Sequence, residues 1–264
     1  MERAVAQRVT TLPAGADAES CRVDNGTLAH VHDGSAPGAL TCFVHDSFRA
    51  LVLNRHFACL GAQAAVRQNA YRFGLYPALG SLSSTLCLAR GLQSFNDDAE
   101  LRRRPLTAFA ACFVAPVPGG EEAFERALWT TLQQLNDLDT QPWAAGRRPD
   151  PEDPEFSFSF GGVGFFVVGL HAGSSRLARR FAWPTLVFNP HLQFDRLRSD
   201  GKYAHFQDVI RTRDIALQGS PNPMLSDFGT ASEALQYSGR AVGPDWKCPF
   251  HARRAVPPPD RDEP

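Results

Sequence analysis

The spacing of apolar side chains predicts a mixture of helices and strands. Over Glu121–Leu138, apolar or small side chains recur alternately four and three residues apart, from Phe124 to Leu138. This spacing places them on one face of a helix. A second helix is predicted within residues 54–70, directly before a predicted strand over residues 71–79.

The strongest strand signals lie in the second half of the chain. Phenylalanine alternates with serine from Phe156 to Phe160, which predicts a strand with one buried and one polar face. The following pair, Gly161-Gly162, is a hairpin-turn candidate. The uninterrupted apolar run over residues 165–170 predicts a strand in the middle of a sheet. Two further strands are predicted over residues 107–115 and 185–188.

Strands follow one another as hairpins and neighbours rather than in regular alternation with helices. We therefore expect an α+β fold, with a largely antiparallel sheet flanked by helices. Residues 41–253 are expected to form one domain, because strong strands directly follow the proline-rich connection at residues 144–154. Residues 1–40 show little apolar periodicity and are expected to be loosely structured. Residues 254–264, rich in proline and charge, are expected to be a disordered tail.

Charge and cysteine usage exclude several classes of function. The 264 residues carry 27 Lys+Arg against 28 Asp+Glu, so nothing in the net charge favours nucleic acid or a membrane as a partner. No apolar stretch is long enough to span a bilayer, and no signal-peptide pattern opens the chain. The six cysteines form no CxxC pair. We therefore expect a cytoplasmic protein with reduced thiols and no covalently attached haem.

Two compositional skews bear on function. The chain has 19 Phe but 4 Tyr, and only Lys202 and Lys247 among its 27 basic residues are lysines. The first skew predicts a dry pocket with few hydroxyl groups. The arginines concentrate over residues 176–198, where bidentate binding of carboxylates would serve. The motifs for nucleotide loops, HExxH metal sites and GxSxG nucleophiles are absent.

The segment over residues 169–180, GLHAGSSRLARR, places a histidine beside a cationic cluster. A strand is predicted to end at His171, and a serine after it can cap a short helix. That helix carries three arginines, Arg176, Arg179 and Arg180. A helix start beside arginines suits an anionic group such as phosphate or propionate. The alternative is a solvated basic face.

The segment over residues 188–201, FNPHLQFDRLRSDG, places a second histidine at a helix start. Asn189 is a good N-cap and Pro190 suits the first helical position. His191 then lies in the first turn, where the positive end of the helix dipole disfavours an imidazolium. A neutral imidazole is what a metal or haem iron needs. The alternative is a histidine that only donates and accepts hydrogen bonds.

A rigid turn is predicted at Ser220-Pro221-Asn222-Pro223, because two X-Pro steps exclude helix. Such a turn can hold Asn222 and Asp227 at a pocket wall. A fixed carboxylate, Asp227 or Glu233, can bind a guanidinium group bidentately. The alternative is an ordered loop in which Asp227 serves as a cap or turn residue.

The segment DWKCPFH at residues 245–251 offers a thiol ligand. A cysteine directly before proline is held extended, and Trp246 and Phe250 would give Cys248 a dry wall. Such a thiolate can ligate haem iron. The alternative is a cysteine that serves as a small core hydrophobe.

The second half of the chain resembles a known family. The carrying stretches are FSFGGVGFFVVGLHAGSSRLARRF, PTLVFNPHLQFDRLR, IRTRDIALQGSPNPMLSDFG, SEALQYSGR and DWKCPF. Together they resemble the YqcI/YcgG family and, within it, the haem-dependent guanidine or amine N-hydroxylases of D-cycloserine and guanitoxin biosynthesis. The likeness runs from about Phe57 to Phe250. The family's Phe-Pro-Cys element appears here as Phe57-Ala58-Cys59, with alanine in place of proline.

The resemblance implies a natural-product monooxygenase with noncovalent haem b, which activates dioxygen and places oxygen on nitrogen. The substrate would be a small guanidino or amino compound such as L-arginine. Electrons would come from an external donor, or peroxide would replace them, and a homodimer is allowed. Two alternatives stay open. The first is a haem-binding or haem-sensing protein without turnover. The second is a different metal-dependent oxygenase, or a small-molecule-binding protein without haem whose histidines lie in hydrogen-bond networks.

Roles in such a site follow from residue type. His191 ranks first as the axial ligand because of its predicted position at a helix start, His171 second and Cys248 third. The propionate candidates are Arg176, Arg179, Arg180, Arg196 and Arg198. The apolar slot is expected from Phe160, Phe165, Phe166, Phe188 and Phe194. The substrate is expected to contact Asp227, Glu233 and Asn222.

Overall fold

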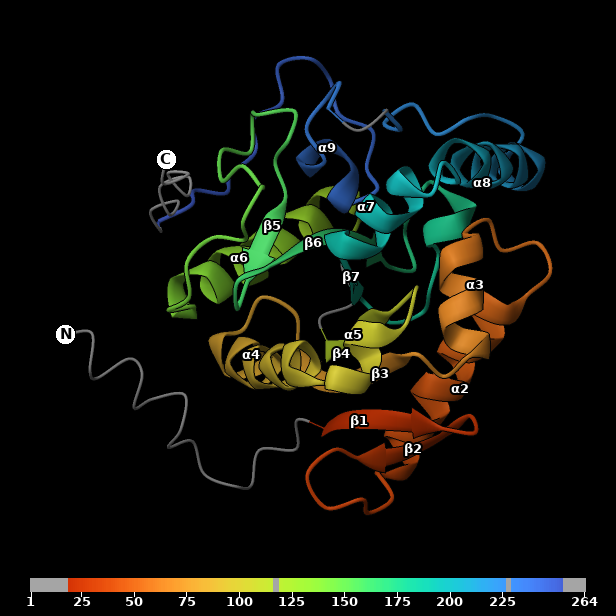
Figure 1. The fold of residues 1–264 in the computed structure, drawn as a ribbon, viewed down its shortest axis with the longest axis vertical. Helices are drawn as coiled ribbons and strands as arrows, with labels where there is room; N and C mark the ends of the chain where they lie inside the picture. The colour runs from red at the N-terminus through yellow and green to blue at the C-terminus, as the bar shows by residue number, and fades with distance from the viewer. Residues whose placement is uncertain (1–18, 116–118, 227–228, 254–264) are drawn as a thin grey trace, which may run out of the picture.

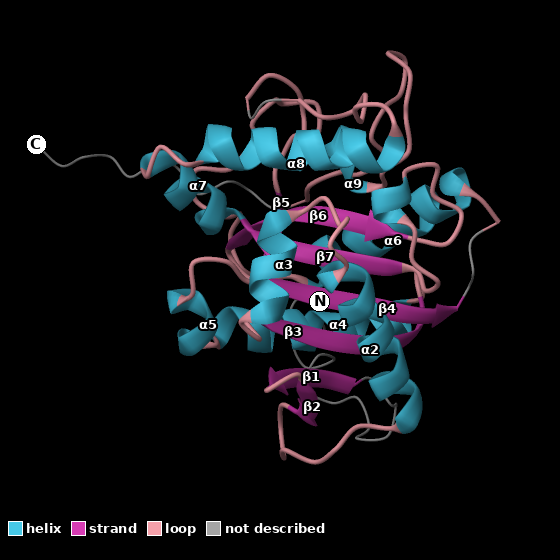
Figure 2. Cartoon of the chain, turned by 90° about the vertical axis from the view of Figure 1, so that its right-hand side faces the viewer, coloured by secondary structure: helices cyan, strands magenta, loops and turns pink. Residues whose placement is uncertain are grey.

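The structure is a computed structural model that describes residues 19–115, 119–226 and 229–253. These residues build a seven-stranded sheet with helices on both faces, as Figures 1 and 2 show from two sides. The strand order is β2-β1-β3-β4-β7-β6-β5. Only the β3–β4 pair is parallel, and the other neighbours are antiparallel. The predicted α+β class with a largely antiparallel sheet is confirmed.

The elements follow one another along the chain in this order. The strands are β1 (Glu19–Asp24), β2 (Thr27–His30), β3 (Tyr71–Ala78), β4 (Ala108–Ala115), β5 (Phe158–Phe160), β6 (Val163–Leu170) and β7 (Thr185–Pro190). The helices are α2 (Ala39–Leu53), α3 (Leu60–Arg67), α4 (Leu82–Asp97), α5 (Ala99–Arg103), α6 (Glu121–Leu138), α7 (His191–Ser199), α8 (Tyr203–Gln218) and α9 (Ala234–Tyr237), with a short 3-10 turn, η1 (Leu177–Arg179). In the described part of the chain, none of the helices combines the length and the apolar character that crossing a membrane requires.

Two hydrophobic cores lie on opposite faces of the sheet. In β4, Phe109 and Phe113 belong to the core under α4 and α6, whereas Ala110 and Cys112 belong to the core under α2. This alternation follows from the two-residue period of a strand. Because helices cover both faces, β4 is buried on both sides and reads as a continuous apolar run. Figure 2 shows α2, α3 and α8 on the near face.

The N-terminal part differs from the expectation of a loosely structured segment. Within residues 1–40, β1 and β2 form a hairpin, and β1 pairs with β3 and so extends the sheet. The turn is Asn25-Gly26, both with positive φ (47° and 81°), which is the geometry that an Asn-Gly hairpin favours. Cys21 and Val23 are buried against the sheet. A short alternation of buried and exposed residues is therefore sufficient for this strand to join the sheet. Residues 1–18 and the tail residues 254–264 lie outside the described part.

Two helices also depart from expectation. Helix α2 was not predicted, although Val44, Phe48 and Val52 lie four residues apart and are buried. The helix predicted within residues 54–70 is confined to α3, because the Cys59 side chain caps its start by accepting a hydrogen bond from the Ala62 amide. Helix α6 spans the predicted residues, and the predicted strands at β3, β4, β6 and β7 are confirmed.

The hairpin β5–β6 carries one further correction. Gly161 and Gly162 form its turn with φ of 62° and 75°, as predicted. The expected polar face of β5 is not exposed, since Ser157 and Ser159 are both fully buried. The connection before β5 covers them, and the Ala144 amide donates to Ser159 Oγ at 3.0 Å. This backbone bond explains how Ser159 can lie on a buried face, whereas the buried Ser157 hydroxyl has no hydrogen-bond partner in the described part of the chain.

Candidate functional site

A cavity of about 270 Å³ lies between the sheet and the helices α2, α3, α7 and α8. Its floor consists of residues from three central strands that point to this face, including Ala108, Phe166, Val168 and Val187. This volume is slightly below the range of about 300–1,000 Å³ that is usual for ligand pockets. The floor is apolar.

Helix α8 forms the roof of this cavity. Tyr203, Phe206 and Ile210 recur three and four residues apart and line the cavity from above. Asp214 is the one buried residue of this helix. An amphipathic helix normally covers a packed core with its apolar face, whereas α8 covers a cavity. The roof therefore gains few apolar contacts when the cavity holds no ligand.

His191 is the first residue of α7 and lines the cavity. Its predicted place in the first turn is confirmed, and the side chain is only 2% exposed. The predicted N-cap is wrong, because Pro190 takes that position. Asn189 belongs to β7 instead, and its side-chain amide donates to the Phe166 and Val187 carbonyls.

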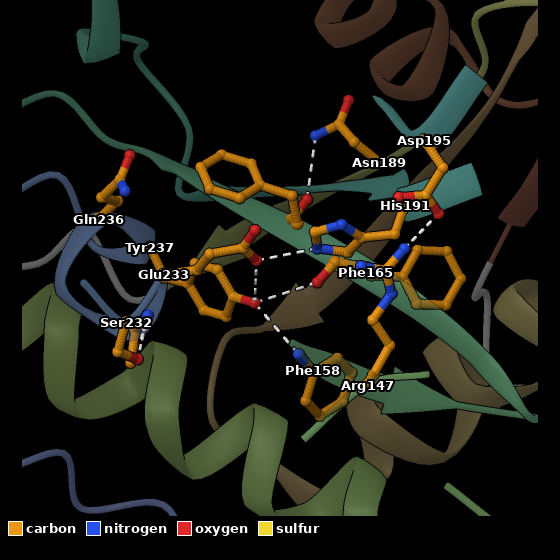
Figure 3. A network of polar contacts seen from close by, with 12 residues as sticks. Arg147, Phe158, Phe165, Asn189, His191, Asp195, Ser232, Glu233, Gln236 and Tyr237 are labelled. Atoms are coloured by element: carbon orange, nitrogen blue, oxygen red, sulfur yellow. Dashed lines mark hydrogen bonds and ion pairs between the residues drawn. The ribbon is translucent and has the colours of Figure 1, made fainter. Parts of the chain in front are cut away.

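Glu233 lies directly before α9 and meets the ring of His191. The distance from His191 Nε2 to Glu233 Oε2 is 2.8 Å, and both side chains are buried. Figure 3 shows the two side chains pointing toward one another from α7 and the α9 segment. Glu233 was expected to hold a cationic substrate. Its carboxylate is instead engaged by a histidine that comes 42 residues earlier in the chain.

Arg176 is neither a solvated cation nor a residue on a helix face. Its guanidinium forms a buried ion pair with Asp214 of α8 and donates to the Ser220 carbonyl at 3.0 Å. The helix predicted here is reduced to the three-residue turn η1, for which Arg176 is the N-cap. Arg176 lines the cavity, but its charge is already paired with the roof helix.

Arg179 also lines the cavity, and all its hydrogen bonds go to backbone carbonyls. The acceptors are Gly169 at the end of β6, and Gln236 and Tyr237 of α9. Burial lowers the pKa of Arg179 to about 10, so it remains a cation at neutral pH. Arg180, by contrast, is exposed and donates to the Ser174 carbonyl. It does not line the cavity.

The two other ligand candidates lie away from this cavity. The His171 ring stacks on Phe124 of α6 at 4.4 Å, and burial lowers the pKa of His171. Cys248 packs against the core under α4 and α6, where burial raises the pKa of its thiol to about 12. Of the three ranked ligands, only His191 borders the cavity.

The phenylalanines divide between the cavity and the opposite core. Phe166 and Phe194 line the cavity. Phe188, like Phe160 and Phe165, belongs to the core on the other face, so its expected place in the slot is wrong. The reason is strand parity, because Val187 and Asn189 face the cavity and the residue between them must face away.

The turn after α8 also reaches the cavity. Asn222 lines it, and its side-chain oxygen accepts a hydrogen bond from the Met224 amide at 3.0 Å. Such a local bond fixes an Asx-type turn. Asp227, predicted beside it as a substrate carboxylate, lies outside the described residues.

Cys59 also lines the cavity, although it is not among the three ligand candidates that the sequence suggests. It lies at the N-cap of α3, where its sulfur accepts from the Ala62 amide at 3.4 Å. Burial raises the pKa of this thiol. The resemblance to a Phe-Pro-Cys element was the available signal. Arg211 and Gln193 line the cavity as well, and Arg198 does so with a hydrogen bond to Asp195 at 2.7 Å.

The charges on the described cavity wall are unbalanced. Four arginines line it, Arg176, Arg179, Arg198 and Arg211, against two carboxylates, Asp214 and Glu233. Such a wall favours a ligand with an apolar body and anionic groups. Haem has this character, since its macrocycle is apolar and its propionates are anionic. Its iron needs one or two ligands from the protein. Within residues 19–115, 119–226 and 229–253, no cluster of three or more His, Cys, Asp or Glu side chains is placed to hold a metal ion by itself.

Comparison with known proteins identifies the family. A model of the YqcI/YcgG family matches residues 48–251. The chain belongs to the YqcI/YcgG family. Every residue that lines the cavity, from Phe48 to Gln236, lies within this YqcI/YcgG match.

Two curated proteins share part of the chain. The protein named "Uncharacterized protein YcgG", of Bacillus subtilis (strain 168), is 29% identical over 111 residues, which are 41% of this chain and 44% of that protein. The protein named "Putative N(omega)-hydroxy-L-arginine synthase DcsA", of Streptomyces lavendulae, is 32% identical over 117 residues, 41% of this chain and 43% of that protein. The chain thus matches less than half the length of either relative. No solved structure matches it.

Proposed function

We propose that this YqcI/YcgG protein is a haem-dependent oxygenase that N-hydroxylates a guanidino or amino nitrogen of a small amino-acid-like substrate, L-arginine or a relative. The oxidant would be dioxygen with external electrons, or peroxide. One observation carries the proposal, namely a buried histidine on the wall of an apolar cavity with an excess of arginines. The name of the Streptomyces relative supports N-hydroxylation as the reaction class.

Different residues of the cavity would have different roles. His191 would be the axial ligand, and Phe166 and Phe194 would pack on the macrocycle. Arg179 and Arg198 would meet the propionates, because both line the cavity and a guanidinium group can bind a carboxylate bidentately. The bound haem would supply dioxygen activation and transfer of oxygen to nitrogen. The roof helix α8 would exclude water from the reacting nitrogen.

A haem titration of the purified protein tests the cofactor. We expect a Soret band that saturates at one haem per chain, and its loss or shift in His191→Ala but not in His171→Ala. The second variant removes a buried histidine outside the cavity and serves as the matched control. A protein that stays colourless after haem addition contradicts the proposal. If His191→Ala keeps the wild-type spectrum and Cys59→Ala loses it, the iron ligand is Cys59 and not His191.

A haem-binding protein without turnover is the second candidate function. The observation in its favour is that both carboxylates of the described cavity wall are engaged, Glu233 with His191 and Asp214 with Arg176. An oxygenase for a guanidinium would need another acceptor, for which Asn222 and Asp227 remain proposals. Adding L-arginine to the haem complex separates the two functions. A spectral shift together with a product that has gained one oxygen atom supports the oxygenase, and neither change supports the binding protein.

A further inference from the structure

A buried carboxylate contacts the ring of His191. Glu233 Oε2 lies 2.8 Å from His191 Nε2, and the two residues are 7% and 2% exposed. An ionised carboxylate can only accept hydrogen bonds, so in a bond to such a carboxylate the ring proton is on Nε2. In a neutral ring the lone pair is then on Nδ1.

Tyr237 fixes the carboxylate in turn. Its hydroxyl lies 3.4 Å from the same Glu233 oxygen and 3.0 Å from the Phe165 carbonyl, and it accepts from the Phe158 amide at 3.1 Å. Burial raises the pKa of Tyr237 well above its ordinary range, so the hydroxyl keeps its one proton, for which the Phe165 carbonyl at 3.0 Å and the Glu233 oxygen at 3.4 Å are both acceptors. Tyr237 thereby ties Glu233 to β5 and β6, as Figure 3 shows.

The helix that carries His191 is anchored independently of this carboxylate. Arg147, in the connection before β5, forms an ion pair with Asp195 of α7. Burial would raise the pKa of Asp195, but hydrogen bonds from Arg147 and Arg198 lower it. The backbone of α7 is therefore held on one side and the His191 ring on the other. The ring contact with Glu233 is therefore separate from the ion pair that anchors the helix.

We propose that Glu233 and Tyr237 are positioning residues that set the tautomer and orientation of His191, so that Nδ1 is the nitrogen presented to haem iron. The inference rests on the proposed function, because it assigns the support of that ligand. Carboxylates that accept the second N–H of a ligating histidine fix the ring and raise its basicity. Glu233 is thereby assigned to the ligand and not to the substrate.

Variants of the two residues test this role in the full-length protein. Glu233→Gln keeps the shape but removes the charge, and we expect haem affinity to fall about 10- to 100-fold, with a shifted Soret band and a higher reduction potential because the ligand is less basic. Tyr237→Phe should change the same quantities in the same direction by less. Haem affinity is read from spectroscopic titration, the potential from a redox titration, and folding from the melting temperature of the haem-free protein.

Two controls match the chemistry at another buried site. Glu125 is also 7% exposed, but it pairs with Arg240 and lies outside the cavity. Ser238 donates a buried hydroxyl to Glu125 at 3.0 Å. Glu125→Gln and Ser238→Ala should leave the spectrum, the potential and the haem affinity unchanged.

The outcomes separate the inference from the function it rests on. If the wild type binds haem through His191 while Glu233→Gln and Tyr237→Phe keep the wild-type affinity, spectrum and potential, the positioning role is wrong and the proposed function stands. If Glu233→Gln fails to fold, the result for Tyr237→Phe decides. If the wild type binds no haem, both ideas fall together.

Discussion

Arg176 and Asp214 form a buried ion pair that joins the turn after β6 to the roof helix α8. Their side chains are 8% and 9% exposed, and Asp214 is the one buried residue of α8. A buried ion pair therefore helps to hold α8 in place, whereas most surface helices are held by an apolar stripe that packs on the core. Arg176 also donates to the Ser220 carbonyl, so the same guanidinium positions the turn that carries Asn222.

Removing one member of this pair should destabilise the protein strongly. Asp214→Ala leaves the Arg176 guanidinium buried without its carboxylate, which costs about 3–5 kcal/mol. Arg176→Met combined with Asp214→Leu should restore much of that loss, since neither charge is then buried. Urea unfolding of the single and double variants measures both effects. Equal losses in the single and double variants would show that the ion pair is not the cause.

Haem binding should stabilise α8 more than the rest of the fold. This helix has one buried residue and faces the cavity with its apolar side, so its amide hydrogens should exchange readily in the haem-free protein. A bound macrocycle would give the apolar side of α8 a surface to pack against. Hydrogen exchange with and without haem should show slower exchange over Tyr203–Gln218, and α6 provides the internal control. Equal protection of both helices would contradict a ligand-dependent roof.

Acid should destabilise the protein through His45 on α2. The His45 Nε2 atom lies 2.7 Å from the Tyr71 hydroxyl, and burial, with a contribution from Arg49, lowers the pKa of His45 from 6.5 to about 4. Between these two values the unfolded chain binds a proton that the folded chain does not. The free energy of unfolding should therefore fall as pH drops from about 6.5 to about 4, by up to roughly 3 kcal/mol from this group, and show no dependence on it at higher pH.

The variant His45→Gln isolates this contribution. It should flatten the dependence of the unfolding free energy on pH over that window, as measured by urea denaturation at several pH values. The remaining slope would include His171, whose pKa burial also lowers. An unchanged slope in the variant would rule out His45 as the source.

Gly169 in β6 should not tolerate a larger side chain. A Cβ atom there would lie 2.5 Å from the Phe124 ring and 2.9 Å from the Tyr237 carbonyl oxygen. Gly169→Ala should therefore destabilise by about 1–3 kcal/mol through overpacking, and it should disturb the strand end whose carbonyl Arg179 binds. Thermal denaturation measures the loss. Gly243→Ala is the matched control, because a Cβ at that position meets nothing within 4 Å, and an equal loss there would point away from crowding.

Local sequence patterns anticipated most of the regular structure around the cavity. The helical period over Glu121–Leu138 and the apolar runs of β4 and β6 are local signals, because each depends on residues within one element. The hairpin β1–β2 and helix α2 were missed although both carry local signals, an Asn-Gly turn and apolar residues four apart. The hairpin offers a short signal, because its buried apolar residues are Cys21, Val23 and Leu28.

The place of His191 at a helix start, the abundance of arginine near it and the family itself could all be obtained from the sequence alone. Which ligand candidate borders the cavity was decided by tertiary structure, since the side chains of His171, His191 and Cys248 are all of a type that can ligate iron. Strand parity explains why Phe166 faces the cavity and Phe188 does not. When both faces of a strand are apolar, sequence does not reveal which helices cover which face. The partner of Glu233 was decided in the same way, because a contact across 42 residues depends on how β6, β7 and the α9 segment pack, and no local period encodes that arrangement.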